Sequence, residues 1–236
     1  MKDLLGDRMK GHEVVWNHTL IKRMPVILRL DGKAFHSFLS KIKKTDPFSD
    51  DVHELMFGTM SHLCENIQNA VLGYTQSDEI SILLNDWKQF ETQQWFRGGQ
   101  SKMESIAASM ATGKFNSLNH KLFHPPLGSA EFAMFDCRAF NVPKEDVNNY
   151  FIWRQKDAIR NSVNALGQHY YSTKQLSGKK VDAVKELLLR EKNVDWNALY
   201  PWKRHGVVWT KGVGVDLHGH VATFMDDRTT VDKLLE

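Results

Sequence analysis

The chain has 236 residues, of which 42% are hydrophobic and 25% charged, with a formal net charge of +3. This length is enough for one substantial core or two small ones, and the proportions are those of a soluble globular protein. The absence of repeats and low-complexity segments excludes solenoids and long linkers, and the mild positive charge permits a polyanionic partner without requiring one.

The N-terminus lacks the apolar segment of a signal peptide, and no apolar run approaches the length of a membrane span. We therefore expect a cytoplasmic protein that does not engage a membrane. The two cysteines, Cys64 and Cys137, have neither metal-ligand spacing nor the neighbours of a catalytic cysteine. They are best read as buried thiols in a reducing compartment.

The first two thirds of the chain alternate between short apolar runs and helical periodicity. A helix begins near Asp51, where Glu54 is placed for a capping box. The pattern predicts, in chain order, a strand over 24–30, this helix, a strand over 71–75, a tight turn over 76–79, a strand over 80–84, a helix over 103–115 and a strand over 133–140. This βαββαβ order predicts an α+β fold, the ferredoxin-like split unit with its helices on one face of an antiparallel sheet.

The last third has a different pattern. Helices are expected over 144–171 and 181–192 with a loop at 177–180, and short strands over 206–210 and 221–224. We therefore divide the chain into a catalytic α+β domain over 1–143 and a mostly helical C-terminal region over 144–236 that packs on it.

Two acidic turns stand out because each lies where an apolar run stops. Asp31 directly follows the first strand, and Asp78 lies in the hairpin turn. In the split unit the two would face each other, and their carboxylates are hard oxygen ligands suited to Mg²⁺. Two such ions, about 3.5–4 Å apart, can clamp the attacking and leaving oxygens of a phosphoryl displacement.

The residues around the acidic pair extend this hypothesis. Gly32 offers a carbonyl oxygen to metal, and Glu79 would assist at the second metal or hold the site in shape. The amides of Lys33, Ala34, Phe35 and His36 are placed to cradle a triphosphate. Asp-Gly and Ser-Asp-Glu are also common turn signals, so each motif alone favours a simple turn. Their occurrence together on adjacent strands favours a site.

Other polar stretches have two interpretations each. The stretch 97–102, with its glycines, Ser101 and Lys102 before a helix, fits an anion site or a solvated loop. The same two readings, phosphate contact or solvated charge, apply to Lys41, Lys43 and Lys44. A helical face with Arg154, Asp157, Arg160 and Asn161 fits RNA or nucleotide binding, or surface salt bridges. The stretch 201–206 could stack a base on Trp202 and pair phosphates, or Trp202 could belong to the core.

The chain resembles the tRNA-His guanylyltransferase family, and most closely the guanylyltransferase-like proteins. The resemblance rests on these segments in the family's order: Arg29-x-Asp-Gly-Lys-x-Phe-His-x-Phe38, Gly73-Tyr-x-Gln-Ser-Asp-Glu79, Ser101-Lys102, Trp153-Arg-Gln-x-Asp157 and Pro201 to Gly206. It implies a polymerase palm that adds nucleotides to the 5′ end of tRNA after ATP has activated the 5′-monophosphate. It also implies ATP, GTP and other nucleoside triphosphates as substrates, and a homotetramer built from dimers.

The resemblance also assigns roles. It implies Asp31, the Gly32 carbonyl and Asp78 as Mg²⁺ ligands, and Asp31, Asp78 and Glu79 as catalytic residues. The implied nucleotide-binding residues are Asp31 to His36, Ser77, Asp78 and Lys102. The implied contacts with tRNA or its 5′ end are Lys203 and Arg204, to which we add Lys44, Arg154, Asp157, Arg160 and Asn161.

One departure from the family shifts the expected reaction. In the eukaryotic enzymes Trp-Arg-Gln-x-Asp is followed by His-Ile-Asn-Asn, whereas here the run begins Ala158-Ile-Arg-Asn161. This favours template-dependent 3′–5′ addition that repairs 5′-truncated tRNA over non-templated addition of one G to tRNA-His. A nucleotidyl cyclase, which shares the palm and needs no tRNA, and a non-catalytic RNA-binding protein are the alternatives from other classes.

Overall fold

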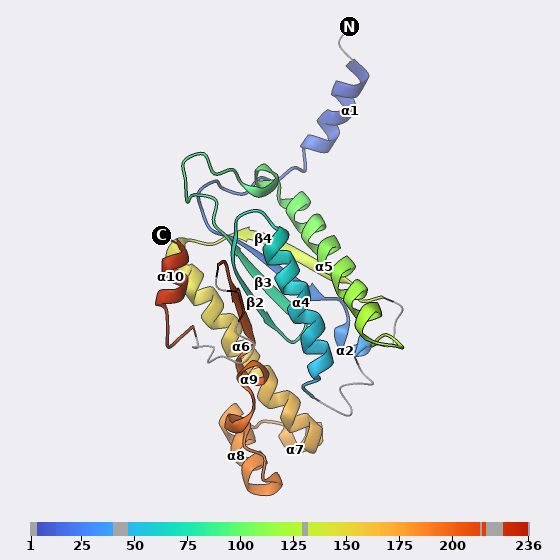
Figure 1. Ribbon diagram of the computed structural model, residues 1–236, viewed down its shortest axis with the longest axis vertical. Helices are drawn as coiled ribbons and strands as arrows, with labels where there is room; N and C mark the ends of the chain where they lie inside the picture. Colours follow the sequence, from blue (N-terminus) through green and yellow to red (C-terminus); the bar gives the residue numbers. More distant parts are fainter. Residues whose placement is uncertain (1–3, 40–46, 129–131, 213, 216–223, 236) are drawn as a thin grey trace.

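The computed structural model describes residues 4–39, 47–128, 132–212, 214–215 and 224–235. Its centre is one antiparallel sheet of six strands in the order β4-β1-β3-β2-β5-β6 (Figure 1). The strands are β1 (Val26–Gly32), β2 (Ala70–Gln76), β3 (Glu79–Leu84), β4 (Phe135–Asn141), β5 (Val207–Thr210) and β6 (Gly214–Val215). The first four strands have the order of the predicted split unit, so that prediction is confirmed.

Helices cover both faces of the sheet. One face carries α4 (Asp50–Asn66) and α5 (Gln100–Leu122), and the other carries α6 (Lys144–Tyr170) and α10 (Thr229–Leu235). The remaining helices are α1 (Leu4–Val14), α2 (Phe35–Phe38), α7 (Thr173–Leu176), α8 (Val181–Lys192) and α9 (Pro201–His205), with short 3₁₀ turns over Trp95–Gly98 and Trp196–Ala198. Helix α1 projects from the body and buries no side chain (Figure 1).

Alternation along the strands divides the core into two layers. Leu28, Leu30, Ile80 and Ile82 face α4 and α5, whereas Ile27, Leu72 and Leu83 face α6 and α10. A third apolar cluster joins the second half of α6 to α8 around Val163, Leu188 and Trp196. The two helices of the predicted split unit, α4 and α5, share one face of the sheet as expected, and α6 of the C-terminal region packs on the other face.

The predicted division at residue 143 is crossed by hydrogen bonds of the sheet. Strand β5 comes from the C-terminal region and pairs with β2, with Thr75 opposite Val207 and Leu72 opposite Thr210. The predicted strand over 206–210 is confirmed. Of the one over 221–224, only Phe224 lies within the described residues, where it is a buried turn residue.

Element ends differ from the prediction for local reasons. Strand β1 continues through Asp31 and Gly32, since both pair with β4. Helix α4 begins at Asp50 because the Ser49 hydroxyl accepts a hydrogen bond from the amide of Val52 at 3.4 Å. This cap replaces the expected capping box with Glu54. Helix α5 is longer than predicted at both ends.

Cys64 is buried and Cys137 half-buried, and both are free thiols. Burial raises the pKa of Cys64, and raises that of Cys137 to about 12. Both thiols therefore stay protonated and unreactive near neutral pH. Within the described parts of the chain, no helix is long and apolar enough to cross a membrane.

Candidate active site

The two acidic turns meet at one end of the sheet. Asp31 lies opposite Glu79 on β3 and opposite Asp136 on β4. The Gly32 amide donates a hydrogen bond to the backbone carbonyl of Asp78 at 3.0 Å, which ties the end of β1 to the hairpin turn. The register of the sheet therefore brings Asp31 and Asp78 together, as the split unit requires.

The hairpin turn is held in an unusual conformation. Ser77 has a positive φ of 50°, which side chains other than glycine and asparagine rarely adopt. Its hydroxyl donates a hydrogen bond to the Asp78 carboxylate at 2.9 Å. Strain of this kind persists where the surrounding structure fixes it, often at functional sites.

Negative charge is concentrated around Asp31. Burial raises the pKa of Asp31, and the carboxylates of Asp78 and Asp136 raise it further, while Arg29 and Arg138 oppose the shift. Asp136 was missed in the sequence because only the pairing of β4 with β1 shows that it lies opposite Asp31. A prediction of how β4 pairs with β1 could have found Asp136, because that pairing places it opposite Asp31.

Glu79 is fixed by an ion pair. Its carboxylate is 2.8 Å from the guanidinium of Arg154, and the two side chains are 12% and 7% exposed. Burial raises the pKa of Glu79, and Arg154 opposes that shift. The expectation that Arg154 contacts RNA is corrected here: its guanidinium lies under the surface, between Glu79 and the ring of Trp153 at 3.4 Å.

The oxygens at this end of the sheet fit a divalent metal. Two carboxylates and the Gly32 carbonyl form a hard donor set, and the mutual repulsion of Asp31 and Asp78 is what a cation relieves. A side chain at Gly32 would meet the ring of Phe35 at 2.4 Å, so only glycine fits. Among the described residues, no three His, Cys, Asp or Glu side chains converge as a metal-ligand group.

The loop after β1 offers fewer amides than expected. The Lys33 amide donates to the carbonyl of Met134 at 2.8 Å, which corrects its assignment to a triphosphate cradle. Ala34 has a positive φ of 54° and starts α2. The ring of Phe35 lies in the core, at 5.1 Å from Phe135, and the expected role of its backbone amide in the triphosphate cradle stays a prediction. His36 is exposed.

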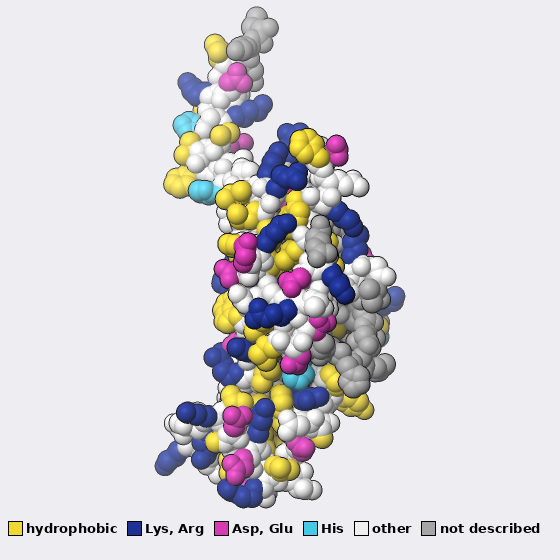
Figure 2. Space-filling model, turned by 90° about the vertical axis from the view of Figure 1, so that its left-hand side faces the viewer, with side chains coloured by type: hydrophobic (Ala, Val, Ile, Leu, Met, Phe, Trp, Pro, Cys, Tyr) yellow, Lys and Arg dark blue, Asp and Glu magenta, His cyan; other side chains and the backbone are white. Residues whose placement is uncertain are grey.

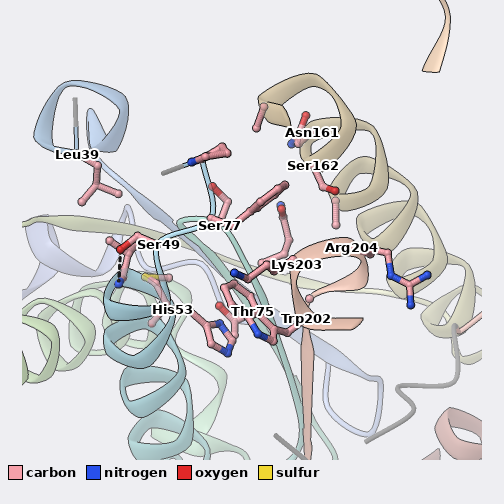
Figure 3. A pocket seen from close by; sticks show the side chains of 18 of the residues that line it. Leu39, Ser49, His53, Thr75, Ser77, Asn161, Ser162, Trp202, Lys203 and Arg204 are labelled. Atoms are coloured by element: carbon pink, nitrogen blue, oxygen red, sulfur yellow. Dashed lines mark hydrogen bonds between the residues drawn. The ribbon is translucent and has the colours of Figure 1, made fainter. Parts of the chain in front are cut away.

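A pocket of about 570 Å³ opens beside the hairpin turn. Its walls come from α2, the start of α4, the end of β2, the second half of α6 and α9 (Figure 3). The described lining includes two cations, Lys203 and Arg204, three histidines, His36, His53 and His169, and no Asp or Glu. The pocket is therefore suited to an anionic ligand and has the volume of a small-molecule site.

Helices α4 and α9 meet at one wall of this pocket through a stacked pair of rings. The rings of His53 and Trp202 are 3.9 Å apart and 10° from parallel (Figure 3). Lys203 adds an ion pair with Asp50 at 3.1 Å. Burial lowers the pKa of His53 to about 4, so this ring is neutral near pH 7. Trp202, for which base stacking and core packing were both open, is stacked on His53.

The remaining predicted residues are spread over several places. Asn161 and Arg204 line the pocket, and in Figure 3 the Arg204 side chain extends away from His53 and Trp202. Asp157 is paired with Arg154 at 3.7 Å and with the exposed Arg160. Lys44 lies outside the described residues.

Within this chain, Lys102 does not lie near the carboxylates of Asp31 and Asp78. Its ammonium lies over the ring of Phe96 at 5.2 Å, at the start of α5. Thr112 of the same helix bonds the amide of Phe135, which lies opposite Gly32. Ten residues of helix, about 15 Å, therefore separate Lys102 from the level of the acidic turns.

The ferredoxin-like sheet, the paired carboxylates on adjacent strands and the cationic pocket beside them define a palm-type nucleotidyltransferase. The family model described as tRNAHis guanylyltransferase (Thg1) matches residues 6–143. The chain belongs to this family of nucleotidyltransferases that act on tRNA.

Solved structures and curated relatives agree with that assignment. A bacterial tRNA(His) guanylyltransferase (Thg1)-like protein in complex with ATP has a TM-score of 0.91 and 38% identity, covering 98% of this chain and 99% of that one. A bacterial Thg1-like protein in complex with GTP has a TM-score of 0.81 and 34% identity, covering 99% of each chain. A probable tRNA(His) guanylyltransferase of Dictyostelium discoideum is 27% identical over 80% of this chain and 76% of its own length.

Proposed function

We propose that the protein adds nucleotides to the 5′ end of tRNA in the 3′–5′ direction, each selected by pairing with the opposite strand. The observation that carries this proposal is Ala158. It lines the pocket at the position where the family's eukaryotic run begins with histidine, and it presents a methyl group instead of a hydrogen-bonding ring. A pocket wall without that group leaves base selection to the template.

The comparisons support the same choice. Identity to the bacterial guanylyltransferase-like structure is 38%, against 27% to the Dictyostelium guanylyltransferase. On the face of the molecule drawn in Figure 2, Lys and Arg are interspersed with Asp and Glu.

The pocket beside Ser77 is the proposed site for the nucleoside triphosphate. Its volume, its cations and the absence of acidic groups among the described lining residues suit a polyphosphate. The two bacterial relatives were solved with ATP and with GTP. Lys203 and His36 stand at the walls of the pocket, where they would contact phosphate.

Asp31, Asp78 and the Gly32 carbonyl would hold Mg²⁺ next to this pocket. When bound, the metal supplies positive charge against the phosphates and lowers the pKa of the attacking hydroxyl. The chain's own part is positional. Arg154 fixes Glu79 opposite Asp31, and the bond from Gly32 to Asp78 fixes the spacing of the two strands.

The test uses 5′-monophosphorylated tRNAs that lack their first nucleotide. Each is incubated with the protein, Mg²⁺, ATP and one further triphosphate, with the opposing acceptor-strand base varied through all four identities. We expect addition only of the complementary nucleotide, for tRNAs of several identities. Addition of G alone to tRNA-His, whatever the opposing base, would replace the proposal with the single-addition reaction.

A second assay separates the tRNA reaction from cyclase chemistry. Triphosphate alone, without RNA, should give no cyclic product. The homotetramer and the second Mg²⁺ ion stay predictions, to be measured by sedimentation of the full chain and by the metal dependence of the rate.

A further inference from the structure

Near the acidic turns, over β1 and β4, lies a surface made of one tryptophan and two arginines. Trp153 on α6 is 51% exposed, although it is a large aromatic residue in the middle of a packed helix. The guanidinium of Arg29 lies over its ring at 5.9 Å. Arg138 on β4 is the register partner of Arg29 and is exposed.

The two arginines lie opposite each other on β1 and β4, and both also act on the nearby carboxylate of Asp31, whose pKa they lower. Residues directly opposite on antiparallel strands have side chains about 5 Å apart. Neither guanidinium forms an ion pair within the described part of the chain, where the ion pairs involve other side chains. A phosphate that lies between the two guanidinium groups would contact two cations that form no ion pair within the described residues.

The exposed ring of Trp153 is suited to stack a nucleobase, whereas the two arginines are suited to bind a phosphate. One face of Trp153 is backed by the buried guanidinium of Arg154 at 3.4 Å, and Tyr150 holds its edge at 5.9 Å. The ring is therefore held in place, although the residue is 51% exposed. Aromatic rings held this way stack nucleobases, and nearby cations bind the adjoining phosphate.

Side chains alternate between the two faces of a strand, and this alternation relates the Trp153 surface to the acidic turns. Arg29 and Asp31 point to the same face of β1, and Arg138 and Asp136 to the same face of β4. Along α6, Trp153 is five residues before Ala158 of the pocket wall, about 7.5 Å of helix. Between Trp153 and Ala158 the same helix carries Arg154, which holds Glu79, and Asp157, which pairs with Arg154.

We propose that Trp153, Arg29 and Arg138 form a second nucleotide site, which stacks a nucleobase and binds the phosphate attached to it. This inference rests on the proposed function, since the pocket and the Trp153 surface would each hold one of the two reactants. The shared chemistry is a nucleobase with a 5′-phosphate, which comes from the 5′ end of the RNA or from a free nucleotide.

The experiment measures binding, with no turnover. The affinity of a 5′-monophosphorylated tRNA is measured by fluorescence anisotropy and that of ATP by calorimetry, for the full chain and for Trp153→Leu, Trp153→Phe and Arg138→Gln. Leucine keeps an apolar cover over Arg154 but cannot stack, whereas phenylalanine keeps the stack. Thermal unfolding confirms that each variant is folded.

We expect Trp153→Leu to weaken tRNA binding roughly tenfold, and Trp153→Phe to restore most of the loss. Arg138→Gln should weaken it and reduce the slope of log affinity against log salt by about 0.7, the value for one phosphate on a single strand. A tRNA with a 5′-hydroxyl should be insensitive to Arg138→Gln. A loss of ATP affinity with tRNA affinity unchanged would assign the site to the free nucleotide.

The chain offers a matched control. Arg23 lies over Phe90 at 5.7 Å, and Phe90 is 85% exposed, but Arg23 precedes the opposite end of β1 from Asp31. Phe90→Leu and Arg23→Gln should leave both affinities unchanged. If Trp153→Leu and Arg138→Gln keep both affinities within twofold, the second site is refuted. If the unaltered protein shows no templated addition, the proposed function is refuted. The second site is tested independently, because the affinities are measured without turnover.

Discussion

Arg154 and Glu79 form the buried ion pair of the site, and Arg154→Met tests it directly. The substitution keeps the length and apolar stem of the side chain but leaves the Glu79 carboxylate without its partner at 2.8 Å. Removing one member of a buried pair typically costs about 3–5 kcal/mol, because the remaining charge stays desolvated. For a chain of this size each kcal/mol lowers the unfolding midpoint by about 2–4 °C, so a loss of roughly 6–20 °C is expected.

Thermal and urea unfolding of Arg154→Met, Glu79→Gln and the double variant measure this coupling. The double variant should recover much of the stability, because no buried charge is left alone. Since Arg154 lowers the pKa of Glu79 against the effect of burial, its removal should raise that pKa and move the acid limb of nucleotide addition to higher pH.

The surface pair of Arg190 and Glu191, 3.0 Å apart with side chains 65% and 45% exposed, is the matched control. Arg190→Met should leave the unfolding midpoint unchanged, since solvent screens exposed pairs. The reasoning fails if Arg154→Met unfolds at the same temperature as the unaltered protein and adds nucleotides at the same rate.

Three further predictions concern the carboxylates, one histidine and one glycine. Asp31→Asn or Asp78→Asn should abolish nucleotide addition, measured on radiolabelled tRNA, with circular dichroism unchanged; normal rates would refute the metal assignment. His53 has a pKa of about 4 in the fold against an ordinary 6.5. As the pH falls from 6.5 to 4, the unfolded chain binds a proton at this histidine and the folded chain does not. The free energy of unfolding should therefore fall by up to about 1.4 kcal/mol per pH unit. The variant His53→Phe should reduce this slope, measured by urea unfolding at several pH values. Gly206→Ala, at φ 78° with its new Cβ 2.6 Å from the Thr75 carbonyl, should cost about 1–3 kcal/mol in unfolding experiments. Gly178→Ala, at φ 74° in open space, should cost less.

Local patterns were enough to predict the sheet and its acidic turns. Apolar runs that end at Asp31 and at the turn around Asp78 define both the strands and the place where they stop. The split-unit order then requires the two turns to meet, and the structure brings them together through the bond from Gly32 to the Asp78 carbonyl. The hydrophobic periodicity and the lengths of the connections were enough to predict the order of strands and helices, so no long-range contact had to be known.

The partners of the acidic turns depend on packing that the sequence does not display. Glu79 and Arg154 are 75 residues apart and meet because α6 crosses the face of the sheet opposite α4. Asp136 could be assigned only from the register of β4. For Lys102 the local sequence was misleading. The residues before α5 resemble an anion site, but the helix runs so that they lie at the far end of the sheet from the acidic turns.

The pairing of β2 with β5 has a consequence for how the chain is made. The residues that pair, Leu72 with Thr210 and Thr75 with Val207, are more than 130 positions apart, so the ribosome completes most of the chain before this edge of the sheet can close. Until then the backbone of β2 is an open template and the apolar face under α6 is uncovered, both of which favour aggregation. We therefore expect a fragment that stops at residue 143 to be insoluble, and the full chain to depend on chaperones late in synthesis.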